Sequence, residues 1–216
     1  MANLPTVFRQ TGEQVILNFD WTDLASGTGY VIYYLMKEGN GEYYLIDGTE
    51  IYSHDIITSE ASPSDGIYKQ QHSNDFDVLF KTTRNIKGKA FLCVPIDGEQ
   101  YKAYLSGSLY HYDGSTETLI AQSDAHLDPF STSSTSPPTN VQTVAFDISD
   151  RVHFAAGDIL RLRCQIWGGR QSGGTAATIV MGHDPKNRTV PAANMTKTSD
   201  MTITQSSLHI PFDIDL

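Results

Sequence analysis

The sequence of 216 residues contains only two cysteines, and nowhere does it hold the run of about 18 apolar residues that a membrane helix needs. Two cysteines exclude a disulfide framework and a zinc site with four thiolates. The missing apolar run excludes a helix that spans a membrane, so we expect no membrane partner. Residues 1–6 have neither a basic region nor an apolar stretch, and we therefore expect no secretion signal.

Basic residues are also few, because 15 Lys and Arg stand against 25 Asp and Glu and leave a net charge of −10. A protein that binds along a phosphate backbone is normally basic, so we do not expect a nucleic-acid partner. Hydrophobic residues make up 39% of the chain, with nine Phe and eleven Tyr. This content is enough for a packed core, which excludes wholesale disorder, and the length suits a single domain.

Long amphipathic helical patterns are missing as well, and alternation with a period of two dominates instead. Five Asx-Gly pairs, which favour tight turns between antiparallel strands, punctuate the chain. We predict an all-β fold, a single antiparallel β-sandwich of jelly-roll type with under about a tenth helix. The predicted strands are 14–19, 30–36, 43–46, 75–80, 90–96, 101–112, 116–121, 141–148, 159–167, 176–181 and 201–210.

The domain organisation that follows is an N-terminal arm, residues 1–13, and a sandwich domain, residues 14–216. Residues 129–140 and 182–200 are rich in Pro, Ser, Thr or Asn, and we interpret them as long surface loops. The nearly continuous apolar run 90–96 predicts a core strand that is buried on both faces.

One triplet could bind a metal ion. In an extended segment Asp124, His126 and Asp128 would point to one face and present two carboxylates and an imidazole. Asp and His are also common in solvated turns, and the triplet stands just before a Pro- and Ser-rich loop. We favour the turn interpretation and expect neither a metal nor another cofactor.

Candidate nucleophiles and bases are scattered. His54-Asp55 and His183-Asp184 are adjacent pairs, and adjacent side chains on a strand diverge, so neither pair predicts a catalytic dyad. The Gly-x-Ser-x-Gly pattern of a nucleophile elbow is absent from the sequence. We expect instead that Pro185 directs the chain into a turn and that Asp184 is structural, accepting hydrogen bonds from the backbone or from Arg188.

Cys93 and Cys164 both occur in apolar strand contexts, and we predict that both are core residues. Arg161 and Arg163 flank Cys164, but the alternation of a strand places them on the opposite face, where they cannot activate the thiol. We therefore expect no catalytic site and no enzyme activity.

Several other motifs have an ordinary structural interpretation. The glycine-rich segment 168–174 is not followed by Lys and Ser or Thr, so we interpret it as a turn and not as a phosphate loop. The sequons at Asn187 and Asn194 are interpreted as chance matches. Carboxylate pairs for glycoside hydrolysis stay open, since spatial separation defines them. A dense group of tyrosines suggests a sugar-stacking face, although sheet aromatics are the favoured interpretation: Tyr30, Tyr33, Tyr34, Tyr43, Tyr44 and Tyr52.

Three stretches carry a family resemblance: FDWTDLASGTGY at 19–30, GHDPKNR at 182–188 and IPFDIDL at 210–216. Together they resemble jelly-roll decoration (cement) or related virion surface proteins of tailed phages, over most of residues 14–216. The resemblance implies a non-enzymatic homotrimer that is made in the host cytoplasm, binds the major capsid protein on the capsid exterior and stabilises the shell. More loosely, FAAGDILRL at 154–162 is similar to the trimeric jelly rolls of the C1q/TNF type.

The arm contains Leu4, Val7 and Phe8 beside Arg9, and we predict that these residues bind the partner by ordering against it. The alternative is a frayed terminus with no role. Two other functions stay open for the whole chain. One is a tail-associated or receptor-binding jelly-roll domain that binds host glycans, and the other is a carbohydrate-active enzyme or lectin-like module unrelated to virions.

Overall fold

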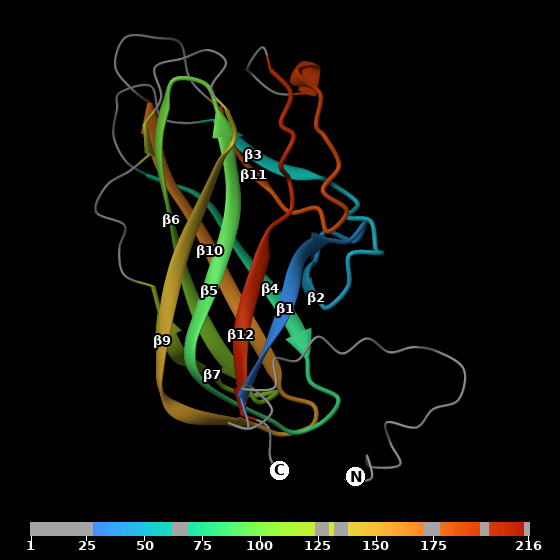
Figure 1. Ribbon diagram of the computed structural model, residues 1–216, viewed down its shortest axis with the longest axis vertical. Helices are drawn as coiled ribbons and strands as arrows, with labels where there is room; N and C mark the ends of the chain where they lie inside the picture. The colour runs from blue at the N-terminus through green and yellow to red at the C-terminus, as the bar shows by residue number, and fades with distance from the viewer. Residues whose placement is uncertain are drawn as a thin grey trace, which may run out of the picture.

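The computed structural model describes residues 28–61, 69–123, 130–131, 138–170, 178–194 and 199–213 (Figure 1). The only helical element in these ranges is a short 3-10 turn, η2, which confirms the all-β prediction. The strands are β1 Thr28–Lys37, β2 Tyr43–Ile46, β3 Ile57–Ala61, β4 Lys69–Leu79, β5 Arg84–Gly98, β6 Tyr101–Tyr112, β7 Glu117–Gln122, β8 Phe130–Ser131, β9 Asn140–Phe154, β10 Ile159–Arg170, β11 Thr178–Gly182 and β12 Ser207–Asp213, with η2 at Ala192–Asn194.

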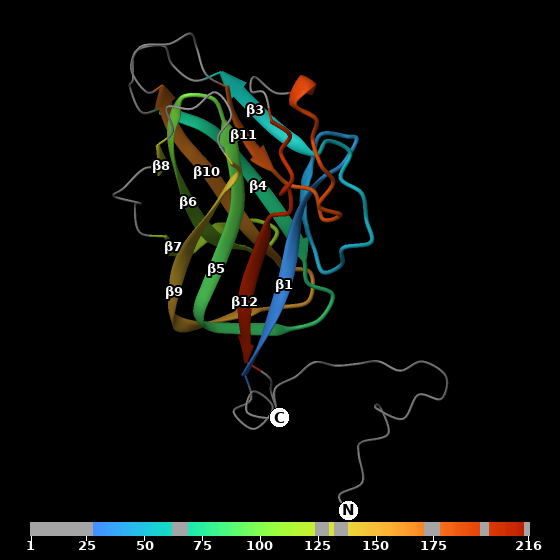
Figure 2. The same cartoon turned by 45° about the horizontal axis from the view of Figure 1, so that its top comes forward.

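The strands form one hydrogen-bonded sheet in the order β3-β11-β5-β12-β1-β2-β4-β10-β6-β7, with β8 on β6 and β9 on β5. This sheet folds over itself into two layers (Figures 1 and 2). We call β9, β5, β12 and β1 the front layer, and β4, β10, β6 and β7 the back layer. All pairings among the described strands are antiparallel except that of β2 with β4, where Tyr44 stands opposite Asp77. The result is the predicted β-sandwich of jelly-roll type.

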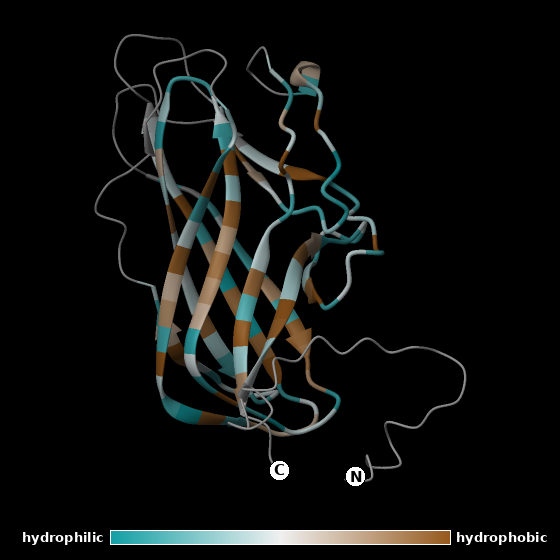
Figure 3. Cartoon of the chain, in the orientation of Figure 1, coloured by the Kyte–Doolittle hydropathy of each residue, from teal (hydrophilic) through white to brown (hydrophobic). Residues whose placement is uncertain are grey.

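The core lies between the layers and follows from the alternation of the strands. In β9, Val144, Phe146 and Ile148 are buried while their neighbours are exposed, and apolar and polar bands alternate along the strands of both layers (Figure 3). The layers approach closely at Gly107 in β6, where a Cβ would lie 2.7 Å from Cζ of Phe146. Any larger residue at this position would have to displace the ring, so the glycine is required by packing.

The turn between β6 and β7 shows how local residues start a hairpin. Gly114 has φ 91°, a conformation that glycine adopts without strain. The carboxylate of Asp113 accepts hydrogen bonds from the backbone N–H groups of Thr116 and Ser115, at 2.8 and 2.9 Å. These donors stabilise the charged carboxylate and lower the pKa of Asp113 to about 2. The turn predicted from Asp-Gly is therefore confirmed.

The prediction that 90–96 is buried on both faces is wrong for Phe91 and Cys93, which are partly exposed. Both lie on the outer side of the front layer, and burial on both faces begins only at Val94. Cys93 is therefore not a core residue, and its sulfur lies 3.4 Å from Oγ1 of Thr143. The reason is that an apolar run in the sequence does not tell whether a second layer covers its outer face. Cys164 is fully buried, as predicted.

The final strand begins later than predicted, at residue 207 instead of 201. Hydroxyls in the intervening segment bond to the end of β11 and to the loop after it. Thr204 Oγ1 donates to the carbonyl of Arg188 at 2.8 Å, and Ser206 Oγ donates to that of Gly182 at 2.6 Å. These side-chain contacts replace a strand ladder. The short strand β3 was not predicted, and the predicted strand 14–19 lies outside the described residues, as does the arm, residues 1–13.

Candidate functional site

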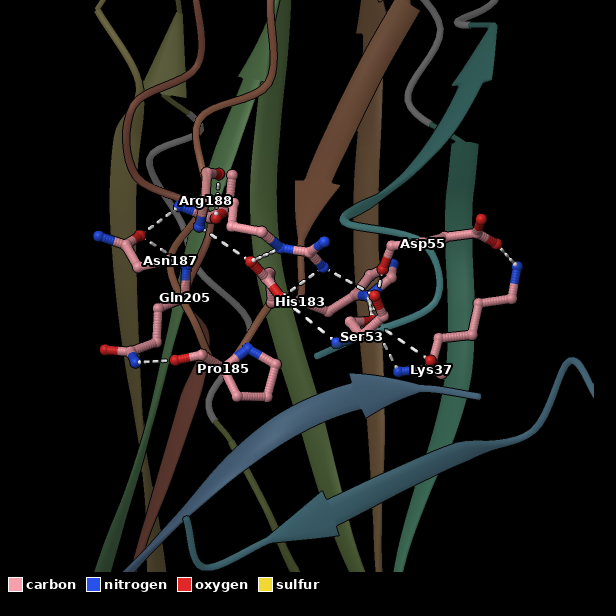
Figure 4. A network of polar contacts seen from close by, with 10 residues as sticks. Lys37, Ser53, Asp55, His183, Pro185, Asn187, Arg188 and Gln205 are labelled. Carbon is pink, nitrogen blue, oxygen red and sulfur yellow. Dashed lines mark hydrogen bonds and ion pairs between the residues drawn. The ribbon is translucent and has the colours of Figure 1, made fainter. Parts of the chain in front are cut away.

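A buried polar network joins the loop after β2 to the loop after β11 (Figure 4). The side chain of Asp184 is completely buried, and the guanidinium of Arg188 donates to its two carboxylate oxygens, from Nε at 2.9 Å and from Nη2 at 3.0 Å. The backbone N–H of Arg188 adds a bond of 2.8 Å, and its Nη2 donates to the carbonyl of Ser53 at 2.7 Å. The predicted partnership of Asp184 with Arg188 is confirmed.

Burial alone would raise the pKa of Asp184, but hydrogen bonds from the side chain and backbone of Arg188 and the charge of that residue hold the pKa below its usual value. The carboxylate is thus charged at neutral pH although it is shielded from water. A buried carboxylate that is paired in this way fastens two distant parts of the chain to each other.

His183 belongs to the same network and contacts a serine. Its Nε2 lies 2.8 Å from Oγ1 of Thr58, and its Nδ1 lies 3.4 Å from Oγ of Ser53. Burial lowers the pKa of His183 to about 4, so the ring is neutral at pH 7. His183 is 0% exposed and Ser53 is 2% exposed, and the Ser53 hydroxyl also donates to the carbonyl of Lys37 at 3.3 Å. A substrate cannot reach this buried Ser–His contact, which helps to hold the two loops together.

The prediction that His54 and Asp55 diverge is wrong. Nδ1 of His54 lies 3.2 Å from Oδ1 of Asp55, whose other oxygen accepts a bond of 2.6 Å from Nζ of Lys37. The hydrogen bond with Lys37 lowers the pKa of Asp55 and raises that of the lysine. Residues 51–56 lie outside the strands, so strand parity does not apply to this pair. The three residues form an ion-pair cluster at the surface.

The outer surface of the back layer carries a row of charged pairs. Arg161 binds both oxygens of Asp77, from Nε and Nη2 at 2.8 Å, and Glu117 from Nη1 at 2.6 Å. Arg163 binds both oxygens of Asp75 in the same way, each at 2.8 Å. These hydrogen bonds raise the pKa of both arginines. We call these five side chains the charged ladder.

Strand parity was right about the thiol behind the ladder. Cys164 points into the core between the two layers, away from the arginines, and burial raises its pKa to about 12. It therefore stays a neutral thiol at physiological pH and is no nucleophile.

A groove of about 530 Å³ opens beside the ladder, where β2 and β4 part. The two strands are paired at only one position, so their remaining residues separate and leave room. Within the described residues, the amide nitrogen Nδ2 of Asn74 is buried without a hydrogen-bond partner. The lining consists of Glu42, Tyr43, Tyr44, Ser73, Asn74, Asp75, Asp77, Arg161 and Arg163.

Sequence reasoning missed this groove. The sequence did hold one signal. Asp75 and Asp77 alternate along one strand, Arg161 and Arg163 alternate along another, and opposite charges of this kind are typical of one face of two paired strands. The separation of β2 from β4 had no such signal.

The outer surface of the front layer is different. Lys89 stands opposite Asp147 on it, but the next two aligned rows contain no charged residue. One row is Ile32, His209, Phe91 and Ala145, and the next is Tyr34, Ser207, Cys93 and Thr143. Tyr30 and Val141 border these rows and are 51% and 45% exposed. Burial lowers the pKa of His209, so this ring is neutral at pH 7 as well. We call the two rows with Tyr30 and Val141 the uncharged face.

The remaining predicted site residues lie outside the described residues: Leu4, Val7, Phe8 and Arg9 of the arm, and Asp124, His126 and Asp128 of the metal candidate. Within the described ranges, no group of three or more His, Cys, Asp or Glu side chains could hold a metal ion. The same ranges contain no helix with the length and apolar character to cross a membrane.

Several solved structures of low sequence identity are similar to this chain. An α-amino acid ester hydrolase is 9% identical with a TM-score of 0.54, over 84% of this chain and 36% of that one. A CocE/NonD family hydrolase from Staphylococcus aureus is 10% identical, with a TM-score of 0.44, over 86% and 37% of the two chains. VP2 of an infectious bursal disease virus subviral particle, also 10% identical, has a TM-score of 0.28 over 87% and 37%.

This chain thus spans little more than a third of the length of those proteins. The likeness to the ester hydrolase shows the fold alone, and viral capsid protein VP2 stands among the structural neighbours. Neither the models of known protein families nor the sequences of curated proteins give a match.

Proposed function

We propose that this chain is a structural protein of a virion, a non-enzymatic decoration or cement protein that assembles as a homotrimer on the outside of a capsid and stabilises it. The jelly-roll fold and the sequence resemblance to phage decoration proteins support this function. The observation that carries it is the uncharged face. Although the chain is acidic, these two rows on the outer surface of the front layer contain no charged residue.

The occupant of the uncharged face is a second copy of the chain. Copies with a net charge of −10 repel one another, so they associate best where charges are few. Interface cores are depleted of charge and enriched in aromatic side chains, as on this face with Tyr30 and Phe91. Among the described strands, β9 pairs only with β5, so its other edge is open at the border of this face. A neighbouring copy would cover that edge.

Sedimentation of the full-length chain and two charge variants tests the assembly. We expect a trimer for the wild type and a monomer for Ile32→Glu, because the variant buries three negative charges around one axis. Leu119→Glu is the matched control, since Leu119 is exposed on the back layer. It should remain trimeric. A monomeric wild type, or equal behaviour of the two variants, contradicts the assembly.

Binding to the shell is tested with capsids of the cognate virus assembled without this protein. If the arm binds the capsid, removal of residues 1–12 should leave the trimer intact and abolish its co-sedimentation with the capsids. If the full-length protein does not co-sediment with the capsids, the proposed function is wrong. If the truncated protein still binds, the sandwich domain makes the capsid contact. The predicted partner-binding role is then wrong for Leu4, Val7, Phe8 and Arg9.

A further inference from the structure

Beyond the charged ladder, the outer surface of the back layer carries an aromatic pair. Tyr104 of β6 and Trp167 of β10 face each other in register, with ring centroids 6.2 Å apart and an interplanar angle of 2°. Both side chains are partly exposed. By strand parity Trp167 shares its face with Gln165 and Arg163, and at about 3.4 Å per residue it lies roughly 14 Å along β10 from Arg163. A stacked pair of aromatic rings and the charged ladder therefore lie on the same outer surface.

The ladder offers hydrogen bonds but little net charge. Each arginine is held by a carboxylate through two bonds, so neither a free anion nor a free cation finds an unpaired opposite charge. The carboxylate oxygens of Asp75 and Asp77 keep further lone pairs, because each oxygen can accept more than one bond. The outcome is a rigid array in which donors and acceptors alternate.

Two buried polar atoms in strands of the back layer lack the partners that buried groups normally have. Among the described residues, the buried side-chain atoms without a hydrogen bond are Nδ2 of Asn74, which lines the groove, and Oγ of Ser106. Ser106 is 8% exposed and stands opposite Gln165, between the ladder and the aromatic pair. An unpaired buried polar group is destabilising, so both atoms favour a ligand that completes their bonding.

From this placement we infer that the outer surface of the back layer, from the groove to Trp167, is a binding site for a neutral oligosaccharide. Sugar hydroxyls both donate and accept, which matches the mixed ladder and the two unpaired atoms. The apolar face of a sugar ring can stack on the electronegative face of an aromatic ring such as that of Trp167. The site lies on the layer opposite to the uncharged face, so it goes beyond the proposed capsid function and is independent of it.

Native gel electrophoresis of the full-length chain tests this site. The gels contain xylan, mannan, laminarin or hydroxyethyl cellulose as neutral probes, and chondroitin sulfate as an anionic probe. We expect at least one neutral polysaccharide to retard the protein. Trp167→Ala and Asp75→Asn should each weaken the retardation by about tenfold, the loss of one stacking contact or one strong hydrogen bond.

Tyr52→Ala is the matched control, because Tyr52 is an aromatic residue that is 64% exposed in the loop after β2, where its ring contacts Lys186 and Arg188. It should be retarded like the wild type. Thermal melting of each variant confirms that the chain is folded, and Asp75→Asn keeps the test valid if Trp167→Ala does not fold.

The site is wrong if chondroitin sulfate alone retards the protein, if none of the neutral probes does, or if both variants are retarded as strongly as the wild type. Sedimentation separates this result from the capsid function, since Trp167→Ala should remain a trimer whatever its sugar binding.

Discussion

Two arginine–carboxylate clusters in this sandwich use the same chemistry in different surroundings. In the network between the loops, the Asp184 side chain is 0% exposed to water, whereas in the charged ladder the side chains of Asp75 and Asp77 are 35% and 27% exposed. The first cluster joins two segments that are far apart in the sequence, and the second joins neighbouring strands that are already paired through their backbones. The difference shows which cluster holds the fold and which is available to a ligand.

The physical reason is the cost of removing charge from water. A buried carboxylate that loses its partner has no water to replace the lost bonds, so the remaining structure is strongly destabilised. A partly exposed pair exchanges one set of hydrogen bonds for another with solvent, and its net contribution to stability is small. A change in the ladder should therefore affect stability much less than a change in the network.

The largest effect that separates the clusters is expected for Asp184→Ala. Loss of the buried carboxylate leaves the guanidinium of Arg188 and the backbone N–H of Ser53 without their acceptor. We expect the free energy of unfolding in urea to fall by roughly 3–5 kcal/mol. The variant should keep any retardation by neutral polysaccharides under conditions where it is folded. A loss no greater than that of Asp75→Ala would remove the distinction between the clusters.

The second prediction concerns pH and the buried ring of His183. Its pKa is about 4 in the folded chain against an ordinary 6.5, so between these values the unfolded chain binds more protons. Stability therefore falls as the pH drops through this window, by roughly 3 kcal/mol in total from this group.

Unfolding free energies of the wild type and His183→Gln, measured from pH 7 to pH 4, isolate this contribution. The difference between the two curves should shrink toward low pH, because the variant has no ring to protonate. His209, whose pKa is also lowered by burial, is present in both proteins and cancels in the comparison. Parallel curves would show that folding does not lower the pKa of His183.

A smaller effect is expected where the ladder is weakened. Asp75→Asn keeps the shape of the side chain but removes the charge that pairs with Arg163. Since both partners are partly exposed and the arginine keeps its contacts with Glu117 and Tyr110, we expect unfolding in urea to change by less than about 1 kcal/mol. A loss of several kcal/mol would make the ladder a structural element like the network.

The smallest effect is one of reactivity and leaves stability unchanged. Iodoacetamide should modify Cys93 in the folded monomer at pH 8, because this thiol is partly exposed on the uncharged face, and should not modify Cys164, whose burial raises its pKa to about 12. Peptide mass analysis identifies the modified residue, and Cys93→Ser is the control without label. In the trimer Cys93 should be protected. Equal labelling of Cys93 in monomer and trimer would place the subunit contact elsewhere.

Local patterns predicted much of the fold. The bounds of β2 and β6 follow from the alternation of their side chains and from the Asx-Gly pairs beside them, since a tight turn depends on the backbone conformation of one or two residues. The same rule placed Arg161 and Arg163 opposite Cys164. It failed for His54-Asp55, because these residues are not in a strand, and for Cys93, because alternation does not tell whether another layer covers a face.

The sequence by itself determined the all-β class, the main strands and the partnership of Asp184 with Arg188, since each depends on residues close together in the chain. Only the tertiary structure decided that Ser53, 131 positions away, donates to Asp184, and that one outer surface carries the charged ladder while two uncharged rows lie on the other. These properties arise from which strands become neighbours. That choice is made by the packing of the whole core, and no local pattern contains it.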